Sequence, residues 1–269
     1  MVDLLRIENL AIHHDGRSLV SGVSLSVNVG ERVGLIGESG SGKSLTALAA
    51  IGLLPEGMTA SGSVRLAGQE VIGTADRDVV ILRGTAVATI FQEPLTALDP
   101  LMRIGDQIAE VLRRRARRDG RSASRADIAA DVMRLMARVA LPEPARLARA
   151  YPHEMSGGQR QRAAIAMALA CRPSLLIADE PTTALDVTTQ AEVLQLLETL
   201  VREEGMGLLF ISHDLPVVGT AVDRVLVLRA GELVEEGAVA EVFDRPRHPY
   251  TIDLVKAARA FDRAIGAAL

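Results

Sequence analysis

The residues best suited to chemistry form a glycine-rich segment, Gly37-Glu38-Ser39-Gly40-Ser41-Gly42-Lys43-Ser44. Glycines let backbone N–H groups converge on phosphate oxygens without obstruction by a Cβ atom, and a following helix N-terminus adds partial positive charge. An apolar run, Val33 to Ile36, precedes the segment, and a helical pattern, Leu45 to Leu54, follows it. This context favours a phosphate-binding loop over an ordinary Gly/Ser-rich turn, with Lys43 on the terminal phosphates and the Ser44 hydroxyl on Mg²⁺.

Two adjacent acids, Asp179 and Glu180, end another apolar run that covers Leu175 to Ala178. In an open parallel sheet, ligands bind beyond the carboxyl ends of the strands, so the acids are expected beside the glycine-rich loop. Because side chains alternate along a strand, the two acids can have different tasks. We expect Asp179 to bind Mg²⁺ and Glu180 to orient and deprotonate a water molecule that attacks phosphate.

Two further polar side chains follow apolar runs in the same way, Gln92 after Phe91 and His213 after Ser212. A single histidine at a strand end is more often structural than catalytic. Together with the acids, however, both side chains are expected at the loop's edge of the sheet. Gln92 is then expected to sense Mg²⁺ and the attacking water, and His213 to contact the terminal phosphate and hold Glu180 in position.

A helix start with an anion-binding pattern lies in the stretch from Met155 to Arg162. Ser156 and Gln159 have the spacing of a capping box, and the helical run continues from Ala163 to Ala170. A capped, Gly-rich helix N-terminus attracts anions. The alternative is a helix cap without a ligand.

The elements that must position these residues alternate between β-rich and helical runs, which is typical of βαβ units and a largely parallel sheet. Two early runs with alternating polarity, Leu4–Ile12 and Val20–Val29, predict an antiparallel addition. The runs predicted to be buried strands are Val33–Ile36, Ala86–Phe91, Leu175–Ala178, Leu208–Ser212 and Val225–Leu228.

The stretch between Gln92 and His153 has a different character, rich in Ala, Arg and Leu, and predicts a helical subdomain inserted into the sheet domain. Within it, the arginine-rich run from Arg113 to Arg118 is interpreted as a solvated helix face rather than a contact with a partner or with lipid headgroups. Apolar residues recur there at helical spacing: Ile128, Val132, Leu135, Met136 and Val139. The predicted boundaries are 1–91 and 156–269 for the sheet domain, 92–155 for the helical subdomain, and 245–269 for a short C-terminal extension.

Composition excludes several classes of protein. A net charge of −4 and only six aromatic residues argue against a nucleic-acid binder. The single cysteine, Cys171, excludes an intrachain disulfide and a Cys-rich metal site. The sequence contains neither an apolar run of roughly 20 residues nor a secretory N-terminus, so we expect a protein that stays in the cytoplasm.

The stretch Met155-Ser156-Gly157-Gly158-Gln159 resembles the signature of ABC cassettes, with Met in the usual place of Leu. The other motifs of that family follow in order, with Gln92 as the Q-loop, Asp179-Glu180 as the Walker B pair, Ala184-Leu185-Asp186 as the D-loop and His213 as the switch histidine. The resemblance runs from about Leu4 to Thr251. It implies a P-loop NTPase fold of the ABC type, with a mostly parallel sheet, an antiparallel β addition and an inserted helical subdomain.

The resemblance also implies a site for ATP and Mg²⁺ that is shared between two cassettes. The residues implied to bind ATP within one chain are Gly37, Ser39, Gly40, Ser41, Gly42, Lys43, Ser44 and Leu45. The residues implied to reach the ATP of the other cassette are Ser156, Gly157, Gly158, Gln159 and Asp186. Ser44, Gln92 and Asp179 are implied for Mg²⁺, and Glu180, His213, Gln92 and Lys43 for catalysis.

One position departs from the family pattern. Many cassettes carry an aromatic residue upstream of the P-loop that stacks on adenine, but here the stretch is His13-His14-Asp15. His14 either stacks on adenine in its place or is an exposed turn residue.

Other stretches are similar to the oligopeptide/dipeptide/nickel importer group of ABC cassettes: Phe91–Pro100, Arg103–Ile108, Tyr151–Glu154 and Pro246–Thr251, although the last also fits a Pro-rich turn. The resemblance implies an ATP-hydrolysing subunit that energises import of di- or oligopeptides, or alternatively of nickel or a metallophore. Its implied partners are a second cassette, preferably non-identical, two membrane-spanning permease subunits and a periplasmic or extracellular substrate-binding protein. Such a subunit lies peripherally on the cytoplasmic face of the inner membrane. A soluble ABC ATPase acting on ribosomes or DNA is the remote alternative.

Overall fold

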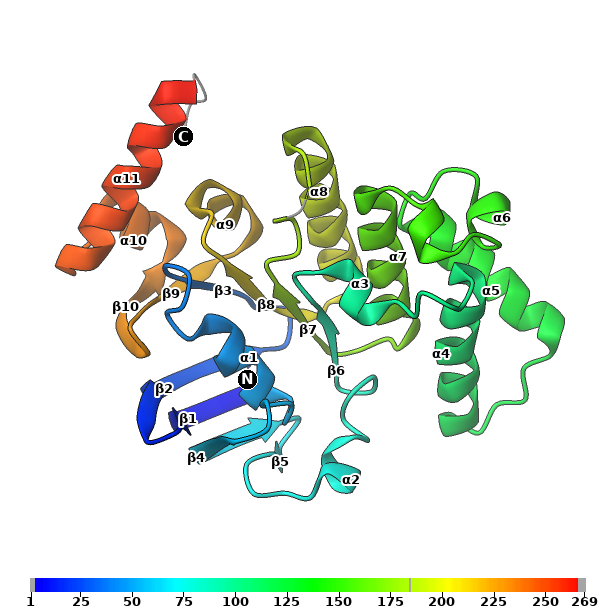
Figure 1. Cartoon of the computed structure of the whole chain (residues 1–269), viewed down its shortest axis with the longest axis horizontal. Coiled ribbons are helices and arrows are strands. Elements are labelled where there is room, and N and C mark those ends of the chain that lie inside the picture. The colour runs from blue at the N-terminus through cyan, green and yellow to red at the C-terminus, as the bar shows by residue number, and fades with distance from the viewer. Residues whose placement is uncertain (1–2, 184, 266–269) are drawn as a thin grey trace.

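Two β-sheets and the helices around them build an α/β fold in the computed structural model, which describes residues 3–183 and 185–265 (Figure 1). The first sheet is antiparallel, in the order β2-β1-β4-β5. The second has the order β10-β9-β3-β8-β7-β6, with parallel pairing from β9 to β6 and an antiparallel edge strand, β10. The strands are β1 (Asp3–His14), β2 (Arg17–Asn28), β3 (Arg32–Ile36), β4 (Met58–Leu66), β5 (Gln69–Glu70), β6 (Val87–Ile90), β7 (Leu175–Asp179), β8 (Gly207–Ser212), β9 (Arg224–Arg229) and β10 (Glu232–Ala238). A mostly parallel sheet with an antiparallel addition is the predicted fold class.

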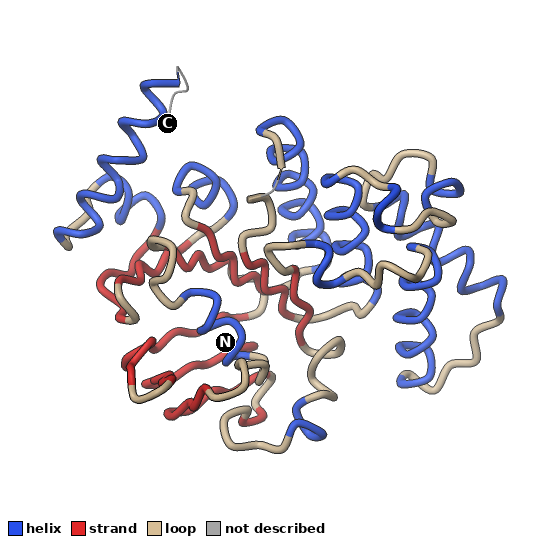
Figure 2. The backbone as a smooth tube through the Cα atoms, in the orientation of Figure 1, coloured by secondary structure: helices blue, strands red, loops and turns tan. Residues whose placement is uncertain are grey.

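The helices fall into three groups along the chain. Figure 2 shows the helices in blue around the strands in red. Two belong to the N-terminal part, α1 (Lys43–Ala50) and α2 (Asp76–Val79). Between the neighbouring strands β6 and β7 come α3 (Pro94–Ala97), α4 (Ile104–Arg118), α5 (Arg125–Arg138), α6 (Pro144–Leu147), the 3₁₀ helix η1 (Pro152–Glu154) and α7 (Gly157–Ala170). The C-terminal group is α8 (Val187–Glu204), α9 (Leu215–Ala221), α10 (Val239–Asp244) and α11 (Pro249–Ile265). Within the described residues, no helix combines the length and the apolar character needed to cross a membrane.

The parallel sheet separates two apolar cores because its central strands are buried on both faces. On β8, Leu209 and Ile211 pack in the core that contains α1 and the antiparallel sheet. Leu208 and Phe210, which alternate with them, pack in the core that contains α7, α8 and α9. This two-sided burial holds the strand ends, and the polar residues that follow them, in fixed positions.

The predicted strands are all present, and their ends differ from the predicted ones by at most three residues. β6 is shorter than the predicted Ala86–Phe91, covering Val87–Ile90. The sequence prediction omitted β4, β5 and β10, which lack a strong apolar signal because they bury few side chains: β10 has none in the fully buried class. The helix predicted to reach Leu54 ends at Ala50, since Gly52 has φ +66° and cannot continue a right-handed helix.

The helical pattern predicted for the inserted stretch corresponds to α5. Ile128, Val132 and Met136 are buried on that helix, and Val139 is buried at its end. They pack in the same apolar core as Ile108 of α4. The spacing therefore marks the face with which α5 packs against α4 and α7.

The arginine run Arg113–Arg118 at the end of α4 is solvated only in part, which corrects the predicted solvated face. The Arg115 guanidinium donates to the carbonyl oxygen of Ala170 at 2.8 Å. Arg118 donates to the carbonyl oxygen of Gly84 at 3.1 Å. Because both acceptors belong to chain segments outside α4, these arginines tie the end of the helix to its surroundings.

Candidate functional site

The glycine-rich loop joins β3 to α1 and requires glycine for steric reasons. Gly37 has φ +151°, and a Cβ atom there would lie 2.1 Å from the carbonyl oxygen of Leu228. Gly42 has φ +102°, and a Cβ atom there would lie 2.9 Å from a methyl group of Val20. Since residues with a side chain rarely adopt such backbone conformations, glycine is needed at both positions.

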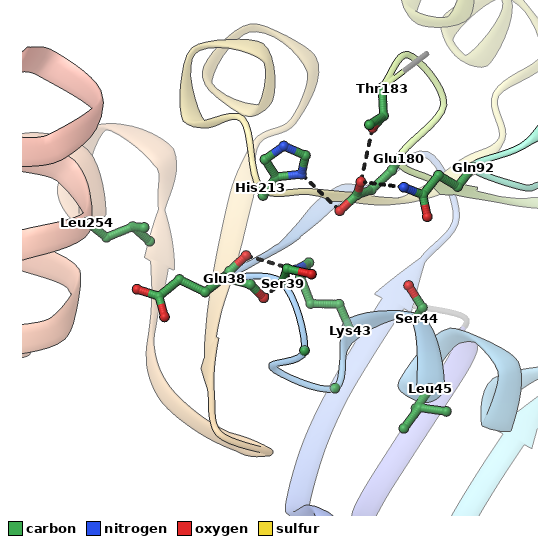
Figure 3. A pocket seen from close by; sticks show the side chains of 13 residues that line it. Glu38, Ser39, Lys43, Ser44, Leu45, Gln92, Glu180, Thr183, His213 and Leu254 are labelled. Carbon is green, nitrogen blue, oxygen red and sulfur yellow. Dashed lines mark hydrogen bonds and ion pairs between the residues drawn. The ribbon is translucent and has the colours of Figure 1, made fainter. Parts of the chain in front are cut away.

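The loop borders a cavity of about 510 Å³ that contains most of the predicted site residues. Its described lining consists of Gly37, Glu38, Ser39, Gly40, Gly42, Lys43, Ser44, Leu45, Gln92, Glu180, Thr183, His213 and Leu254 (Figure 3). Backbone N–H groups at the start of α1 and the Lys43 ammonium make this cavity suited to phosphate. Ser41, also predicted here, is buried at 5% exposure.

The Lys43 ammonium is held by the loop itself. It is 4% exposed and donates to the carbonyl oxygens of Gly37 at 2.8 Å and Glu38 at 2.9 Å. Burial lowers the pKa of Lys43, while the charges of Glu180 and Asp179 oppose this shift. The amine therefore lies next to the cavity, on backbone acceptors that phosphate oxygens can replace.

Asp179 and Ser44 come together from the ends of β7 and the loop. The Ser44 hydroxyl donates to the Asp179 carboxylate at 3.1 Å, across 135 residues of sequence. Burial raises the pKa of Asp179, more than the Ser44 hydrogen bond and the Lys43 charge lower it. A hydroxyl beside a desolvated carboxylate is a set of hard oxygen donors.

The Glu180 carboxylate is the centre of a hydrogen-bonded group of side chains (Figure 3). One of its oxygens accepts from Gln92 Nε2 at 3.2 Å and from the Thr183 hydroxyl at 3.0 Å. The other lies 2.9 Å from His213 Nδ1. An ionised carboxylate has about four acceptor positions, so these three bonds leave room for one proton of a water molecule.

The backbone of Glu180 is unusual as well. Its φ of +45° is rare for a residue with a side chain. Its N–H donates to the carbonyl oxygen of Ile211, so hydrogen bonding to β8 continues one residue past the end of β7. Such sparsely populated conformations cost free energy and persist only where the surrounding structure enforces them. The fold therefore holds the Glu180 backbone in a strained conformation that directs its carboxylate.

Glu38 of the loop lines the cavity although it was not among the predicted site residues, and outside the loop the same holds for Thr183 and Leu254. Thr183 follows Glu180 by three residues in the turn after β7, a spacing that allows its hydroxyl to return to the carboxylate. Leu254 lies on α11, more than 200 residues beyond the loop, and no local pattern marks it.

The signature-like stretch lies apart from this cavity. The Ser156 hydroxyl accepts from the N–H of Gln159 at 3.3 Å, and the Gln159 side chain accepts from the N–H of Ser156 at 3.1 Å. Gly157 lines a smaller cavity of about 120 Å³, which shares only Gln92 with the described lining of the first. Gly158 packs against α8, where an added Cβ would lie 2.5 Å from a Thr189 methyl group.

Asp186 also lies outside the described lining of the large cavity. Its carboxylate caps α8 by accepting from the N–H of Thr189 at 3.0 Å and from the Thr189 hydroxyl at 2.7 Å. Ala184, the first residue of the predicted D-loop, lies outside the described residues. The single chain therefore brings together the loop, the acids, Gln92 and His213, but not Asp186 or the signature residues.

His14 ends β1 and does not line the large cavity. Its imidazole Nδ1 lies 3.7 Å from the Asp15 carboxylate, and its side chain is 42% exposed. Stacking on adenine stays a prediction for this residue.

Comparisons with known proteins agree with this geometry. The sequence profile of the family described as ABC transporter matches residues 20–183. A putative peptide import ATP-binding protein of Brucella ovis is 50% identical over 244 residues, which are 88% of this chain and 71% of that protein. A dimeric structure of the ATP-binding cassette MJ0796 bound to ADP and Pi superposes with a TM-score of 0.76 at 30% identity, covering 87% of this chain and 98% of the other.

Longer relatives match as well. The oligopeptide transport ATP-binding protein OppD of Mycobacterium tuberculosis is 45% identical over 273 residues, which cover 100% of this chain but 44% of that protein. The glutathione import ATP-binding protein GsiA of Salmonella choleraesuis is 45% identical over 93% of this chain and 41% of its own length. The chain thus spans less than half the length of these two relatives. With the profile matched over more than half of the chain, and the loop, the acid pair and the capped glycine-rich helix in the expected places, this chain belongs to the ABC transporter family.

Proposed function

We propose that this chain is the ATP-binding and ATP-hydrolysing subunit of an importer for di- or oligopeptides. The observation that carries the proposal is the Glu180 carboxylate, held by Gln92, Thr183 and His213 at the edge of the phosphate-binding cavity. The cargo class rests on the relatives, whose names describe peptide, oligopeptide and glutathione import.

In this mechanism the phosphates of ATP lie against the N-terminus of α1. Lys43 transfers its hydrogen bonds from the carbonyls of Gly37 and Glu38 to the terminal phosphate oxygens. Glu180 accepts a proton from the attacking water, while His213 and Gln92 keep the carboxylate aimed. The reaction is hydrolysis of the bond between the β- and γ-phosphates.

Mg²⁺ suits the donors present at this site. Ser44 and Asp179 supply a hydroxyl and a carboxylate. The nitrogen of the Gln92 amide donates to Glu180, and its oxygen accepts no hydrogen bond from the described part of the chain. Within the described residues no group of three or more His, Cys, Asp or Glu side chains gathers as a metal site. Mg²⁺ commonly accepts so few protein ligands because phosphates and water complete its shell. When bound, the ion neutralises charge on the phosphates during transfer.

Removal of Mg²⁺ tests this part of the proposal. Hydrolysis measured as phosphate release is expected to fall at least about 100-fold in excess EDTA, because several kcal/mol of charge stabilisation is lost. Added Mg²⁺ is expected to restore it. Phosphate release that continues unchanged in the chelator would exclude a role for the ion.

A second cassette completes the site in this proposal. Ser156, Gly157, Gly158, Gln159 and Asp186 lie away from the cavity of their own chain. The N-terminus of α7, at Ser156 to Gln159, suits a phosphate presented by a partner. Asp186 is proposed to reach the site of the partner from the start of α8. We propose a partner of the same family, non-identical or a second copy, with 92–155 as the helical subdomain that transmits its motion. The two permease subunits, the substrate-binding protein and a location on the cytoplasmic face of the membrane belong to the same proposal.

Affinity capture tests the assembly. The tagged chain, purified from detergent-solubilised membranes of its own cell, is expected to carry two multi-span proteins and a cassette. The binding protein of that system is then expected to prefer peptides over nickel complexes in a calorimetric titration. Recovery of ribosomal or DNA-repair proteins without membrane subunits would overturn the import function and leave the ATPase assignment standing.

A further inference from the structure

The segment that leads into α11 is fastened to the edge strand β10. The Glu235 carboxylate accepts from the backbone N–H of Arg247 at 2.8 Å with one oxygen and from that of His248 at 3.0 Å with the other. The N–H of Tyr250 donates to His248 Nδ1 at 3.2 Å. These hydrogen bonds therefore fix the start of α11 against β10.

Tyr250 contacts the phosphate-binding loop from this position. Its hydroxyl oxygen accepts from the backbone N–H of Glu38 at 3.0 Å, and only 8% of the residue is exposed. The guanidinium carbon of Arg229 lies 5.0 Å from the centre of the ring. Burial raises the pKa of Tyr250, so the hydroxyl stays neutral at physiological pH. One turn further along α11, Leu254 lines the phosphate-binding cavity (Figure 3).

The acceptor role of Tyr250 falls on a specific peptide group. The carbonyl of Gly37 and the N–H of Glu38 belong to the same peptide unit. Lys43 donates to that carbonyl at 2.8 Å, and Tyr250 accepts from that N–H. Opposite ends of one peptide unit are thus fixed by two side chains that lie 207 residues apart in the sequence.

ATP binding changes only one of these two contacts. Lys43 must leave the Gly37 carbonyl to reach phosphate, whereas the hydrogen bond to Tyr250 can persist. Gly37 has no side chain to restrict its ψ angle, so rotation of the peptide unit is easy without a second anchor. The Tyr250 hydroxyl keeps the unit oriented while the lysine is engaged elsewhere.

We propose that Tyr250 is a positioning residue for nucleotide binding: from α11, it holds the Gly37–Glu38 peptide so that the loop keeps its phosphate-binding form after Lys43 transfers to ATP. The inference rests on the proposed ATP-binding function. It assigns the Pro246–Thr251 segment a role in the site instead of that of a turn.

The test is Tyr250→Phe, which removes the hydroxyl and keeps the ring beside Arg229. The N–H of Glu38 then lacks its acceptor. Part of the binding free energy of ATP is then used to order the loop, both in the bound state and in the transition state. We expect KM for ATP, and the Kd of a fluorescent ATP analogue, to rise about three- to tenfold while kcat changes less than about twofold.

Two further variants make the result specific. Tyr151→Phe is the matched control, because Tyr151 is the other tyrosine of the chain and is not among the described lining residues of the phosphate-binding cavity. KM is expected to stay at the wild-type value. Glu235→Gln can accept only one of the two N–H groups of Arg247 and His248, so it is expected to raise KM in the same direction by a smaller factor. If Tyr250→Phe fails to fold, as judged by circular dichroism, the Glu235→Gln result decides.

The outcomes separate this inference from the proposed function. A wild-type protein that neither binds nor hydrolyses ATP contradicts the proposed function itself. An active wild type whose Tyr250→Phe variant keeps its KM and Kd overturns the role of Tyr250 alone. A loss of kcat with unchanged KM, or a lowered Tm with both parameters unchanged, also overturns it, because either result indicates a role other than orienting the loop for the nucleotide.

Discussion

Glu180→Gln is expected to lower kcat for ATP hydrolysis by about 100- to 10,000-fold and to leave the affinity for ATP within about twofold of wild type. Glutamine keeps the size of the side chain and can still accept from Thr183, but its amide cannot take a proton from water. In the wild type, contacts with Gln92 and His213 hold the Glu180 carboxylate at the centre of the site. The variant lacks this carboxylate. Steady-state phosphate release and analogue binding together measure the effect.

The matched control is Glu232→Gln, a neutralisation of the same kind at an exposed glutamate at the start of β10. It is expected to have wild-type kinetics. A Glu180→Gln protein that hydrolyses ATP at a rate close to wild type would show that another group activates the water.

The Glu180→Gln variant also tests whether two copies of this chain can pair. With hydrolysis blocked, bound ATP is expected to hold two cassettes together, and light scattering is expected to report twice the 28.6 kDa of one chain. A variant that binds ATP yet remains at 28.6 kDa would require a non-identical partner.

Lys43→Ala is expected to weaken ATP binding by about 10- to 150-fold, because a hydrogen bond to a charged group contributes about 1.5 to 3 kcal/mol. Hydrolysis is expected to fall further, since the ammonium also stabilises charge on the transferring phosphoryl group. The loop carbonyls of Gly37 and Glu38 lose their donor as well, so folding is checked by circular dichroism. Analogue binding and phosphate release measure the two losses.

The chain offers an internal control for this prediction. It contains one other lysine, Lys256, which is exposed on α11. Lys256→Ala is expected to leave both binding and hydrolysis unchanged. In the wild type, ATP is expected to slow acetylation of Lys43 and to leave that of Lys256 unaffected. A Lys43→Ala protein that binds ATP as tightly as the wild type would contradict contact between the Lys43 ammonium and the nucleotide.

The parts of the site that could be predicted from sequence depend on short-range patterns. The strand, glycine loop and helix around Lys43 are contiguous, and Gly37 and Gly42 both have a positive φ that glycine adopts readily. The reciprocal cap of Ser156 and Gln159 joins residues three apart, which a helix start brings into contact by itself. Buried parallel strands are also recognisable in the sequence as apolar runs. The polar residues that follow these runs could therefore be assigned to the same edge of the sheet.

Prediction from such patterns failed where burial or backbone conformation depends on residues that are distant in the sequence. Strand β10 buries too little to have an apolar signature, and α1 ends four residues before the predicted Leu54 because of the backbone at Gly52. Two arginines of the run in α4 bind the carbonyl oxygens of Ala170 and Gly84. Helical spacing alone contains no information on such acceptors.

The sequence by itself determined which groups are available: a phosphate loop, two acids, a glutamine and a histidine at strand ends, and a capped glycine-rich helix. Only the tertiary structure decided how they meet. It gave Glu180 its positive φ, turned Thr183 back onto the carboxylate, and separated the signature helix from the phosphate cavity. It also brought Tyr250 to Glu38 across 212 residues. The physical reason is that neighbours in sequence constrain only the local backbone, whereas contacts between distant residues depend on how the sheets and helices pack together.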